Sequence, residues 1–554
     1  MKKLLIILVS LSVLGGGAYW MVSQPNKAQD ILDHAPKPAV AKPTKEKPYV
    51  EEFTGGDFYV LWKNEQKSRT LNPDNVAAIT TTATTATYTN NWNGFQLSFP
   101  KDWEIDIRQA SNYTRLFTKD FRIDLTVQNV DKAWTSPVGY ITSTIETLKP
   151  NITADKRWNQ QGFAARQIDY VRPAITGIDR DMNQYSYLFL IRGNRVFSFQ
   201  LKTDEQHFES MKAALIQMAS TLKIVSPIQM DLNTAIKANP PNPEVRLKHK
   251  LDSLIIPKNH LVMGAYLPNS RDIDALNEYL ENPLGAQMFY KPIDNGYDVY
   301  TKELLDNDRL PIVTLLYEKA NSTTNADVIE NIINGTYDQS LLTWAESVKS
   351  LNGPVLFRLG NEMNGDWSEW SHKNTYNDPD LYKLTFRHIV ELFKKNGTDN
   401  AYFVWNPNHV SSPYFEWNEA HMYYPGDKYV DFVGMTSYNF GKTQWNNYQS
   451  IPTLYEDLYW EYSRSYYEKP LMIGEFAAVE TGGNKAEWIT SAFDEIPRSY
   501  PNIKIAVWFD QAHGQFDFRI RTSPASAEAF KNGMAKPAVV KGLNYLDKPK
   551  STER

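Results

Sequence analysis

Eight short apolar runs between residues 260 and 510 constrain the fold of this chain more than any other feature. Runs of this kind are expected for strands that are buried on both faces. They occupy residues 261–267, 286–290, 311–316, 355–359, 401–405, 431–435, 471–476 and 503–509. Most are separated by helix-like segments, and strands that alternate with helices form a parallel sheet. Eight repeats predict an α/β fold, a (β/α)8 TIM barrel, over residues 259–540.

The segment 378–397 is the clearest of the expected helices. It begins with acids and a proline, continues with apolar residues three or four positions apart, and ends with Lys394, Lys395 and Gly397. The connection between the fifth and sixth runs has weaker helical character. An open doubly wound sheet is the competing fold. It would normally bring a glycine-rich phosphate turn after its first strand, and "GAYLPNS" is not such a turn.

Residues 51–225 are expected to form a smaller α+β sandwich domain. Strand-like alternation of apolar and polar residues recurs through much of 92–203, and Gly193-Asn194 is a good hairpin turn. Apolar residues then recur at helical spacing from 204 to 224. The opening "GFQLSFPKDW" resembles the PsbP/Mog1-type sandwich over this one short motif. The domain carries no catalytic constellation, so a binding or spacer role is expected.

The remaining segments read as connections. The Thr/Ala-rich stretch 77–91 is either a linker or an exposed strand, and 226–258 is a connector containing proline and asparagine. Residues 25–50, rich in proline and lysine, are expected to be an extended tether, and 541–554 a tail.

The first 24 residues have the form of an export sequence. Lys2 and Lys3 precede a mainly apolar stretch that is close to the ~20 residues needed to span a bilayer. We see no convincing small-x-small cleavage site, so an uncleaved membrane anchor is favoured over a cleaved signal peptide. The rest of the chain is then expected to be extracytoplasmic, either anchored to the cell membrane or secreted.

Composition excludes several classes of function. The length of 554 residues predicts two or three domains, and a hydrophobic content of 42% is enough for a sizeable core. Because the chain contains no cysteine, it has no disulfides, no thiolate nucleophile and no lipoprotein anchor. The net charge is −5, and no long basic run stands out, which argues against a nucleic-acid partner. His372, His409 and His513 lack metal-like spacing, so we expect no catalytic metal and no cofactor. We also expect a monomer.

Two glutamates lie at the C-terminal ends of strands of the predicted barrel. Glu362 comes just after the fourth run and Glu475 ends the seventh, and the C-terminal ends of barrel strands form the active-site face. A single glutamate at a strand end is usually a solvated acid. Two at the same face fit retaining glycoside hydrolysis, in which two carboxyl groups about 5–5.5 Å apart act as acid/base and nucleophile.

Residues 260–540 resemble glycoside hydrolase family 26, the β-mannanase family of clan A. The matching stretches are "GTYDQSLLTWAESVKSLNGPVLFRLGNEMNGDWSEW", "YFVWNPN", "YYPGDKYVDFVGMTSYN", "KPLMIGEFAA" and "VWFD". The resemblance implies an endo-β-glycanase with a polysaccharide substrate, Glu362 as acid/base and Glu475 as nucleophile. It also implies that Tyr438 hydrogen-bonds the nucleophile and that Arg358 tunes the electrostatics of both carboxylates, although Arg358 also fits an ordinary ion pair inside the barrel.

The resemblance also implies aromatic contacts with the sugar. Trp508 would form a floor under the sugar at the cleavage point, and Trp367 and Trp370 would line the cleft. Trp405 is retained as a further binding residue, although core packing explains it equally well, as it does Trp417 and Trp445.

Asn361 departs from the family pattern. Family 26 mannanases carry histidine before the acid/base glutamate, whereas most other clan A families carry an asparagine that contacts the sugar 2-hydroxyl. Mannan is therefore in doubt as substrate, while retaining glycoside chemistry is not. The alternatives are a non-catalytic polysaccharide-binding protein on the same barrel, or an accessory factor in exopolysaccharide production.

Overall fold

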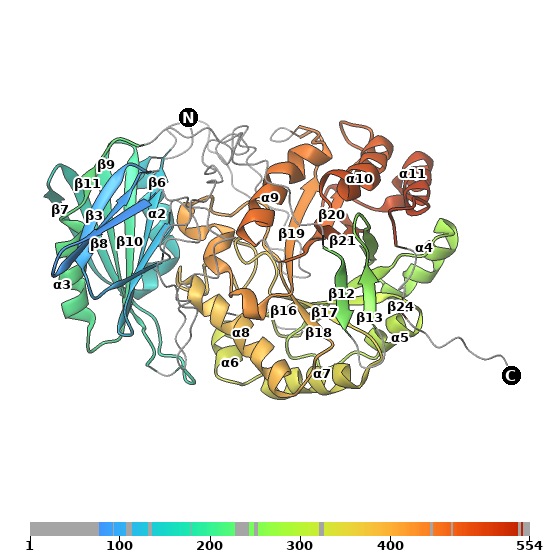
Figure 1. Ribbon diagram of the computed structural model, residues 1–554, viewed down its shortest axis with the longest axis horizontal. Helices are drawn as coiled ribbons and strands as arrows, with labels where there is room; N and C mark the ends of the chain where they lie inside the picture. Colours follow the sequence, from blue (N-terminus) through green and yellow to red (C-terminus); the bar gives the residue numbers. More distant parts are fainter. Residues whose placement is uncertain are drawn as a thin grey trace.

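The computed structural model describes two packed units, a β sandwich drawn in blue and teal and a barrel drawn in green to red (Figure 1). The described residues are 77–91, 93–106, 113–130, 136–178, 180–227, 243–248, 253–320, 326–443, 447–466, 469–540 and 545–546. The predicted anchor, the tether and Trp445 lie outside them. None of the described helices is long and apolar enough to cross a membrane.

Eight parallel strands close into the predicted barrel, because the first of them pairs with the last. The strands are β14 (Val262–Tyr266), β15 (Ala286–Pro292), β16 (Leu310–Leu316), β17 (Val355–Leu359), β18 (Ala401–Trp405), β19 (Phe432–Asn439), β20 (Leu471–Ala478) and β21 (Ile503–Phe509). Each coincides with one of the eight apolar runs, so the (β/α)8 prediction is confirmed. All but a few strand residues are buried, as parallel strands covered by helices require.

Helices cover the outside of the barrel. They are α4 (Ile273–Leu280), α5 (Tyr300–Asp306), α6 (Val328–Ile333), α7 (Asp338–Ser350), α8 (Pro379–Lys395), α9 (Ile451–Ser465), α10 (Lys485–Ser499) and α11 (Pro524–Met534). Helix α8 has the ends that its sequence predicts: the Asp378 side chain accepts from the Asp380 amide, Pro379 starts the first turn, and two lysines occupy the last turn.

Shorter elements complete the barrel unit. The β18–β19 connection holds only 3-10 turns, as its weak helical character suggests: η5 (Glu416–Asn418), η6 (Ala420–Tyr423) and η7 (Asp427–Tyr429). Further 3-10 turns are η4 (Ser270–Asp272) and η8 (Ile520–Thr522), and a hairpin of β22 (Ala512–His513) and β23 (Phe516–Asp517) follows β21. A small sheet joins β12 (Val245–Lys248), β13 (Ser253–Ile256) and β24 (Tyr545–Leu546).

The N-terminal unit is built from two antiparallel sheets. The smaller contains β1 (Ala77–Thr81), β2 (Thr85–Asn90), β3 (Phe95–Pro100) and β11 (Lys223–Ile224). The larger contains, in spatial order, β4 (Glu104–Asp106), β5 (Tyr113–Phe117), β6 (Phe121–Asn129), β10 (Arg195–Thr203), β9 (Gln184–Arg192), β8 (Phe163–Val171) and β7 (Ile152–Gln160). Helices α2 (Pro137–Ile145) and α3 (Phe208–Ala219) and the 3-10 segment η2 (Glu146–Asn151) accompany them. Of the two interpretations of the Thr/Ala-rich stretch, the strand is the correct one, because β1 and β2 form a hairpin within it.

The central strands of the larger sheet are buried on both faces. Side chains alternate across a strand, and odd-numbered positions of β6 and β10, such as Ile123 and Phe199, pack into the core between the two sheets. The even-numbered positions are mostly polar, and they too are buried: Arg122, Asp124, Thr126, Gln128, Ser198, Gln200 and Lys202. This polar face lies against the barrel, where its partners come from the segment between β17 and α8 and from α8 itself.

Candidate active site

Glu362 lies on a left-handed turn directly after β17. Its φ is +56°, and that of Gly360 is +46°, a region that L side chains rarely adopt. The turn brings the Glu362 amide to the Asn406 carbonyl at 2.8 Å, beside the end of β18. Positive φ at a non-glycine residue costs on the order of 1–3 kcal/mol and collects at functional sites.

The Glu362 carboxyl group is buried, at 2% exposure, and accepts two hydrogen bonds. Trp367 Nε1 donates to Oε2 at 2.8 Å, and Asn408 Nδ2 donates to Oε1 at 3.1 Å. Burial raises the pKa of Glu362 to about 7, and the neighbouring negative charge of Glu475 acts in the same direction, against smaller lowering effects of Arg358 and the two donors. Glu362 is therefore a carboxyl group that holds its proton near neutral pH.

Glu475, on β20, has a contrasting environment. Arg358 Nη1 and the Tyr290 hydroxyl each donate to its Oε1 at 2.6 Å, and the Tyr438 hydroxyl donates to Oε2. Three donors, one of them a buried cation, stabilise a carboxylate. The two neighbouring carboxyl groups thus have unequal surroundings, with three donors at Glu475 and a raised pKa at Glu362.

Arg358 is the fully buried cation of the site. Besides Glu475, its guanidinium donates to Asn406 Oδ1 at 2.9 Å and to the Thr436 hydroxyl at 3.2 Å. Gly474 permits this arrangement, because a Cβ atom there would overlap with Asn406 and lie 3.0 Å from Arg358 Nε. The ion pair that the sequence left open is therefore present, and it is formed with the predicted nucleophile.

Two tyrosines at the site were not predicted from the sequence. Tyr290 hydrogen-bonds Glu475, and Tyr266 packs edge-on against Tyr290 with ring centroids 4.9 Å apart. Each lies in the C-terminal half of a barrel strand, β15 and β14 respectively. The same positional rule that selected Glu362 would have found them if it had been applied to aromatic residues.

Trp508 does not line the site, which corrects the prediction of a sugar floor. It is fully buried on the outer face of the barrel, where its ring packs against Phe476, Trp488 and Phe530. The neighbouring Phe509 faces the other way and packs against Tyr266 and Tyr438. The prediction was wrong by one position, and neighbouring positions of a strand point to opposite faces.

Two further tryptophans are also structural. Trp405 is fully buried on the helix side of β18, where it packs against Tyr424, Tyr462 and Tyr466, so it is not placed to bind a sugar. Trp370 is buried, and its ring packs edge-on against Tyr317 with centroids 5.8 Å apart, as a core residue does. Its indole nitrogen also donates to the Asn361 carbonyl at 2.7 Å and supports the turn that carries Glu362.

Trp367 and Asn361 remain candidates for substrate contact. Trp367 is half-buried and bonded to Glu362, and its ring lies over Gly365, where a Cβ atom would collide with it. The side-chain oxygen of Asn361 is buried, and among the described residues it has no hydrogen-bond partner. An amide oxygen without a protein partner beside the acid/base glutamate is suited to a sugar hydroxyl.

The histidines form no metal centre in the described structure. Burial lowers the pKa of His372 to about 3, which makes it a neutral packing residue against Trp417. Across the described ranges, no three His, Cys, Asp or Glu side chains gather in a way that would hold a metal ion.

A model of glycosyl hydrolase family 26 matches residues 313–461, which include Glu362 and Tyr438. Endoglucanase H of Acetivibrio thermocellus is 35% identical over 208 residues, covering 37% of this chain and 23% of the relative. The barrel is a glycoside hydrolase family 26 domain.

Two further relatives of this family 26 domain are named for other polysaccharides. The β-1,3-xylanase TXYA of a Vibrio species is 26% identical over 237 residues, covering 41% of this chain and 46% of the relative. A mannan endo-1,4-β-mannosidase of Bacillus subtilis (strain 168) is 33% identical over 107 residues, covering 18% and 28%. The chain spans less than half of the length of each of these relatives.

The raised pKa of Glu362 predicts a pH-dependent cost to stability. The folded protein keeps this proton up to about pH 7, whereas the unfolded chain loses it near the ordinary value of 4.5. Stability from this group is therefore complete below pH 4.5 and is lost as pH rises to 7, at about 1.4 kcal/mol per pH unit. Glu362→Gln, which cannot titrate, should become progressively more stable than the wild type over that range.

Urea unfolding at several pH values measures this difference. Glu346→Gln, at an exposed position of α7, is the matched control and should follow the wild-type curve. Parallel curves for Glu362→Gln and the wild type would show that Glu362 ionises as readily in the folded protein as in the unfolded chain.

Proposed function

We propose that this chain is a retaining endo-β-glycanase, in which Glu475 is the nucleophile and Glu362 the acid/base. The observation that carries the proposal is the unequal environment of two buried carboxyl groups. Arg358 and two tyrosine hydroxyls donate to Glu475, and burial together with the charge of Glu475 keeps the proton on Glu362. One acid is thus prepared to give a proton and the other to attack.

The first step breaks the glycosidic bond. Glu475 attacks the anomeric carbon while Glu362 transfers its proton to the departing sugar oxygen, which leaves as an alcohol. The product is a glycosyl ester on Glu475, in which that carboxylate has lost its negative charge. Since this charge is one of the causes that raise the pKa of Glu362, the pKa of Glu362 should fall in the intermediate.

The second step uses the lowered pKa. Glu362, now ionised, takes a proton from water as the water oxygen attacks the anomeric carbon, and the ester bond to Glu475 breaks. Two inversions give net retention of the β configuration, and both residues return to their starting protonation states. The charge coupling between the two glutamates therefore drives the change of Glu362 from acid to base.

The two glutamates should respond differently to removal. Glu475→Ala should abolish turnover for all substrates, because no other group replaces the nucleophile. Glu362→Ala should retain more activity on aryl glycosides with good leaving groups, which need less help from an acid, and azide should rescue it with formation of a β-glycosyl azide. Steady-state kinetics and product analysis by NMR measure both effects.

Two results would contradict the proposed function, one in the stereochemistry of the product and one in the range of substrates. Inversion of the anomeric configuration by the wild type would contradict double displacement. Binding without any release of reducing ends, across soluble glucans, xylans and mannans, would instead favour a non-catalytic polysaccharide-binding protein.

The substrate is proposed to be a β-linked polymer of glucose or xylose configuration. Asn361 lies beside Glu362, with a buried amide oxygen that has no partner among the described residues. An asparagine amide is suited to the equatorial 2-hydroxyl of glucose or xylose, whereas mannose carries an axial one. The endoglucanase and β-1,3-xylanase relatives support this assignment, and the mannosidase relative weighs against it.

Matched gluco- and manno-oligosaccharides should reveal the preference. A hydrogen bond to the 2-hydroxyl strengthens as the transition state develops and supplies several kcal/mol, so kcat/KM should differ by orders of magnitude. Asn361→Ala should reduce this ratio while leaving the protein folded. Faster cleavage of the manno series by the wild type would mean that Asn361 does not select the sugar.

The chain is further proposed to act outside the cytoplasmic membrane, held by residues 4–23 as an uncleaved anchor. The support is the Lys-Lys start, the apolar stretch and the lack of a convincing cleavage site. N-terminal sequencing of the protein from its native host should begin near residue 1, with the protein in the membrane fraction. A mature chain that starts near residue 25 and is found in the medium would show a cleaved signal peptide.

A further inference from the structure

Two barrel loops hold the proton-donating side of the active site. The acid/base loop, residues 360–378, carries Glu362 and Trp367. The support loop, residues 406–431, carries Asn408, which donates to Glu362. The loops are joined through Asn364, whose side-chain amide donates to the Asn408 carbonyl at 2.9 Å and whose Oδ1 accepts from the Asn408 amide at 2.9 Å. A displacement of either loop would move the carboxyl group of Glu362.

The far end of the acid/base loop is fastened to the sandwich. Tyr376 and Asn377 both have φ of +55°, and their carbonyl groups accept hydrogen bonds from the Tyr170 hydroxyl at 3.1 Å and from Gln200 Nε2 at 3.0 Å. The Asn377 side chain returns a bond of 2.7 Å to the carbonyl of Thr144. Two consecutive left-handed residues are a strained conformation, and bonds from another domain maintain it here.

Charged groups fix the junction between this loop and α8. Asp378 contacts Arg122 at 3.0 Å and Lys202 at 2.6 Å. Asp380 contacts Arg115 at 3.2 Å and also contacts Arg122. Every one of these side chains is at most 3% exposed. Burial would raise the pKa of Asp380, but Arg115, Arg122 and nearby lysines outweigh it and hold that pKa well below its usual range. Separating these groups would leave uncompensated buried charges.

The support loop meets the same face of the sandwich. The Glu416 amide donates to Gln128 Oε1 at 2.9 Å, and Trp417 Nε1 donates to the Thr144 hydroxyl at 3.1 Å. The Trp417 ring also packs edge-on against His372 of the acid/base loop, with centroids 5.4 Å apart. Trp417, which the sequence left as either core or sugar contact, is thus core at the point where both loops and the sandwich meet.

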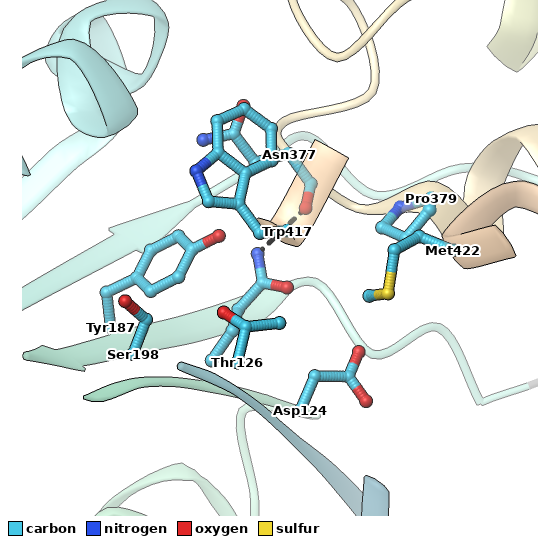
Figure 2. A pocket seen from close by; sticks show the side chains of 9 residues that line it. Asp124, Thr126, Tyr187, Ser198, Asn377, Pro379, Trp417 and Met422 are labelled. Carbon is cyan, nitrogen blue, oxygen red and sulfur yellow. Dashed lines mark hydrogen bonds between the residues drawn. The ribbon is translucent and has the colours of Figure 1, made fainter. Parts of the chain in front are cut away.

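The contact between the two units is closely packed. Figure 2 shows a small cavity between them. Gln200 Nε2, which lines it, donates to the Asn377 carbonyl. The volume of the cavity is about 10 Å³, room for roughly one water molecule. Its lining comes from both units: Asp124, Thr126, Tyr187, Ser198 and Gln200 of the sandwich, and Asn377, Pro379, Trp417 and Met422 of the barrel.

The nucleophile is held differently. The three donors to Glu475 lie on barrel strands: Tyr290 on β15, Arg358 on β17 and Tyr438 on β19. Its position is therefore set by the closed sheet. The two catalytic groups depend on different parts of the molecule, Glu475 on the barrel and Glu362 on two loops that also bind the sandwich.

We infer that the sandwich is a positioning unit for the acid/base, acting through Tyr170 and Tyr185 on its barrel-facing sheet. Tyr185 donates to Asp378 Oδ2 at 2.7 Å, which complements the bond from Tyr170 to Tyr376. The kinetic part of this inference rests on the proposed function, whereas the structural part does not. The sandwich then contributes to proton transfer without containing a residue that touches the substrate.

The experiment compares the full chain with the double variant Tyr170→Phe/Tyr185→Phe. The change removes both hydroxyls and keeps both rings, so the stacking of Tyr170 on Tyr185, with centroids 4.7 Å apart, is retained. Hydrogen–deuterium exchange should become faster by tenfold or more in peptides of residues 360–378, while peptides of β20 exchange as in the wild type. kcat/KM should fall by about ten- to a hundredfold for substrates with poor leaving groups and much less for dinitrophenyl glycosides.

Tyr187→Phe is the matched control. Tyr187 lies on the same strand as Tyr185 and belongs to the same stack of rings, and within the described residues its hydroxyl makes no hydrogen bond to either loop. It should behave as the wild type in both measurements. Thermal unfolding identifies a variant that does not fold, in which case the single variant Tyr170→Phe carries the test.

Two results would overturn the inference. One is unchanged exchange in residues 360–378 of a folded double variant. The other is an equal loss of kcat/KM for good and poor leaving groups, which indicates general damage and not a displaced acid. If the wild type hydrolyses no β-glycan, the proposed function fails, and the exchange measurement still decides whether the sandwich positions the loop.

Discussion

The arrangement of the site depends on the hydrogen bonds that the guanidinium of Arg358 donates. This guanidinium lies inside the barrel and bonds to side chains from four other strands or strand ends: Thr314, Asn406, Thr436 and Glu475. A buried cation needs such partners, because an unpaired one would cost several kcal/mol. Its planar set of donors is rigid, so it also fixes the distances between the groups that it joins. The orientation of the nucleophile and the spacing of the strands are consequently coupled.

The two carboxyl groups show how one environment can produce two chemical roles. Glu475 receives three donors, and Glu362 receives two weaker ones in a buried position near a negative charge. The two side chains are chemically identical, so their different roles come from their surroundings. Burial and then the negative charge of Glu475 raise the pKa of Glu362, whereas one cation and two hydroxyl groups donate to Glu475.

Much of the fold and part of the site followed from the sequence. Apolar runs identified all eight barrel strands because parallel strands are buried on both sides, and a position at or just after the C-terminal end of a run identified Glu475 and Glu362. The sequence could not predict which face of the strand each residue of such a run occupies. A run that is apolar throughout has no alternation of polar and apolar residues to mark the inward side. Trp508 was therefore assigned to the wrong face, and Phe509 was overlooked.

The interface between the units was hidden for the opposite reason. Residues 121–129, FRIDLTVQN, alternate cleanly, and such a pattern ordinarily marks a strand with one face in water. Here the polar face is buried: Arg122 finds Asp378 and Asp380 more than 250 positions away, and Asp124 pairs with Arg122 within the sheet. Local patterns give the polarity of a face but do not show what covers it.

The same polar face has a consequence for the order of events during synthesis. Domains generally fold as units from the N-terminus, so the sandwich is completed while the barrel is still being made. During that interval Asp124 can pair with Arg115 and Arg122, whereas Asp378 and Asp380 have not yet been made. The ion pairs of Arg115, Arg122 and Lys202 with Asp378 and Asp380 therefore form late, when the start of α8 and the loop before it reach the sandwich.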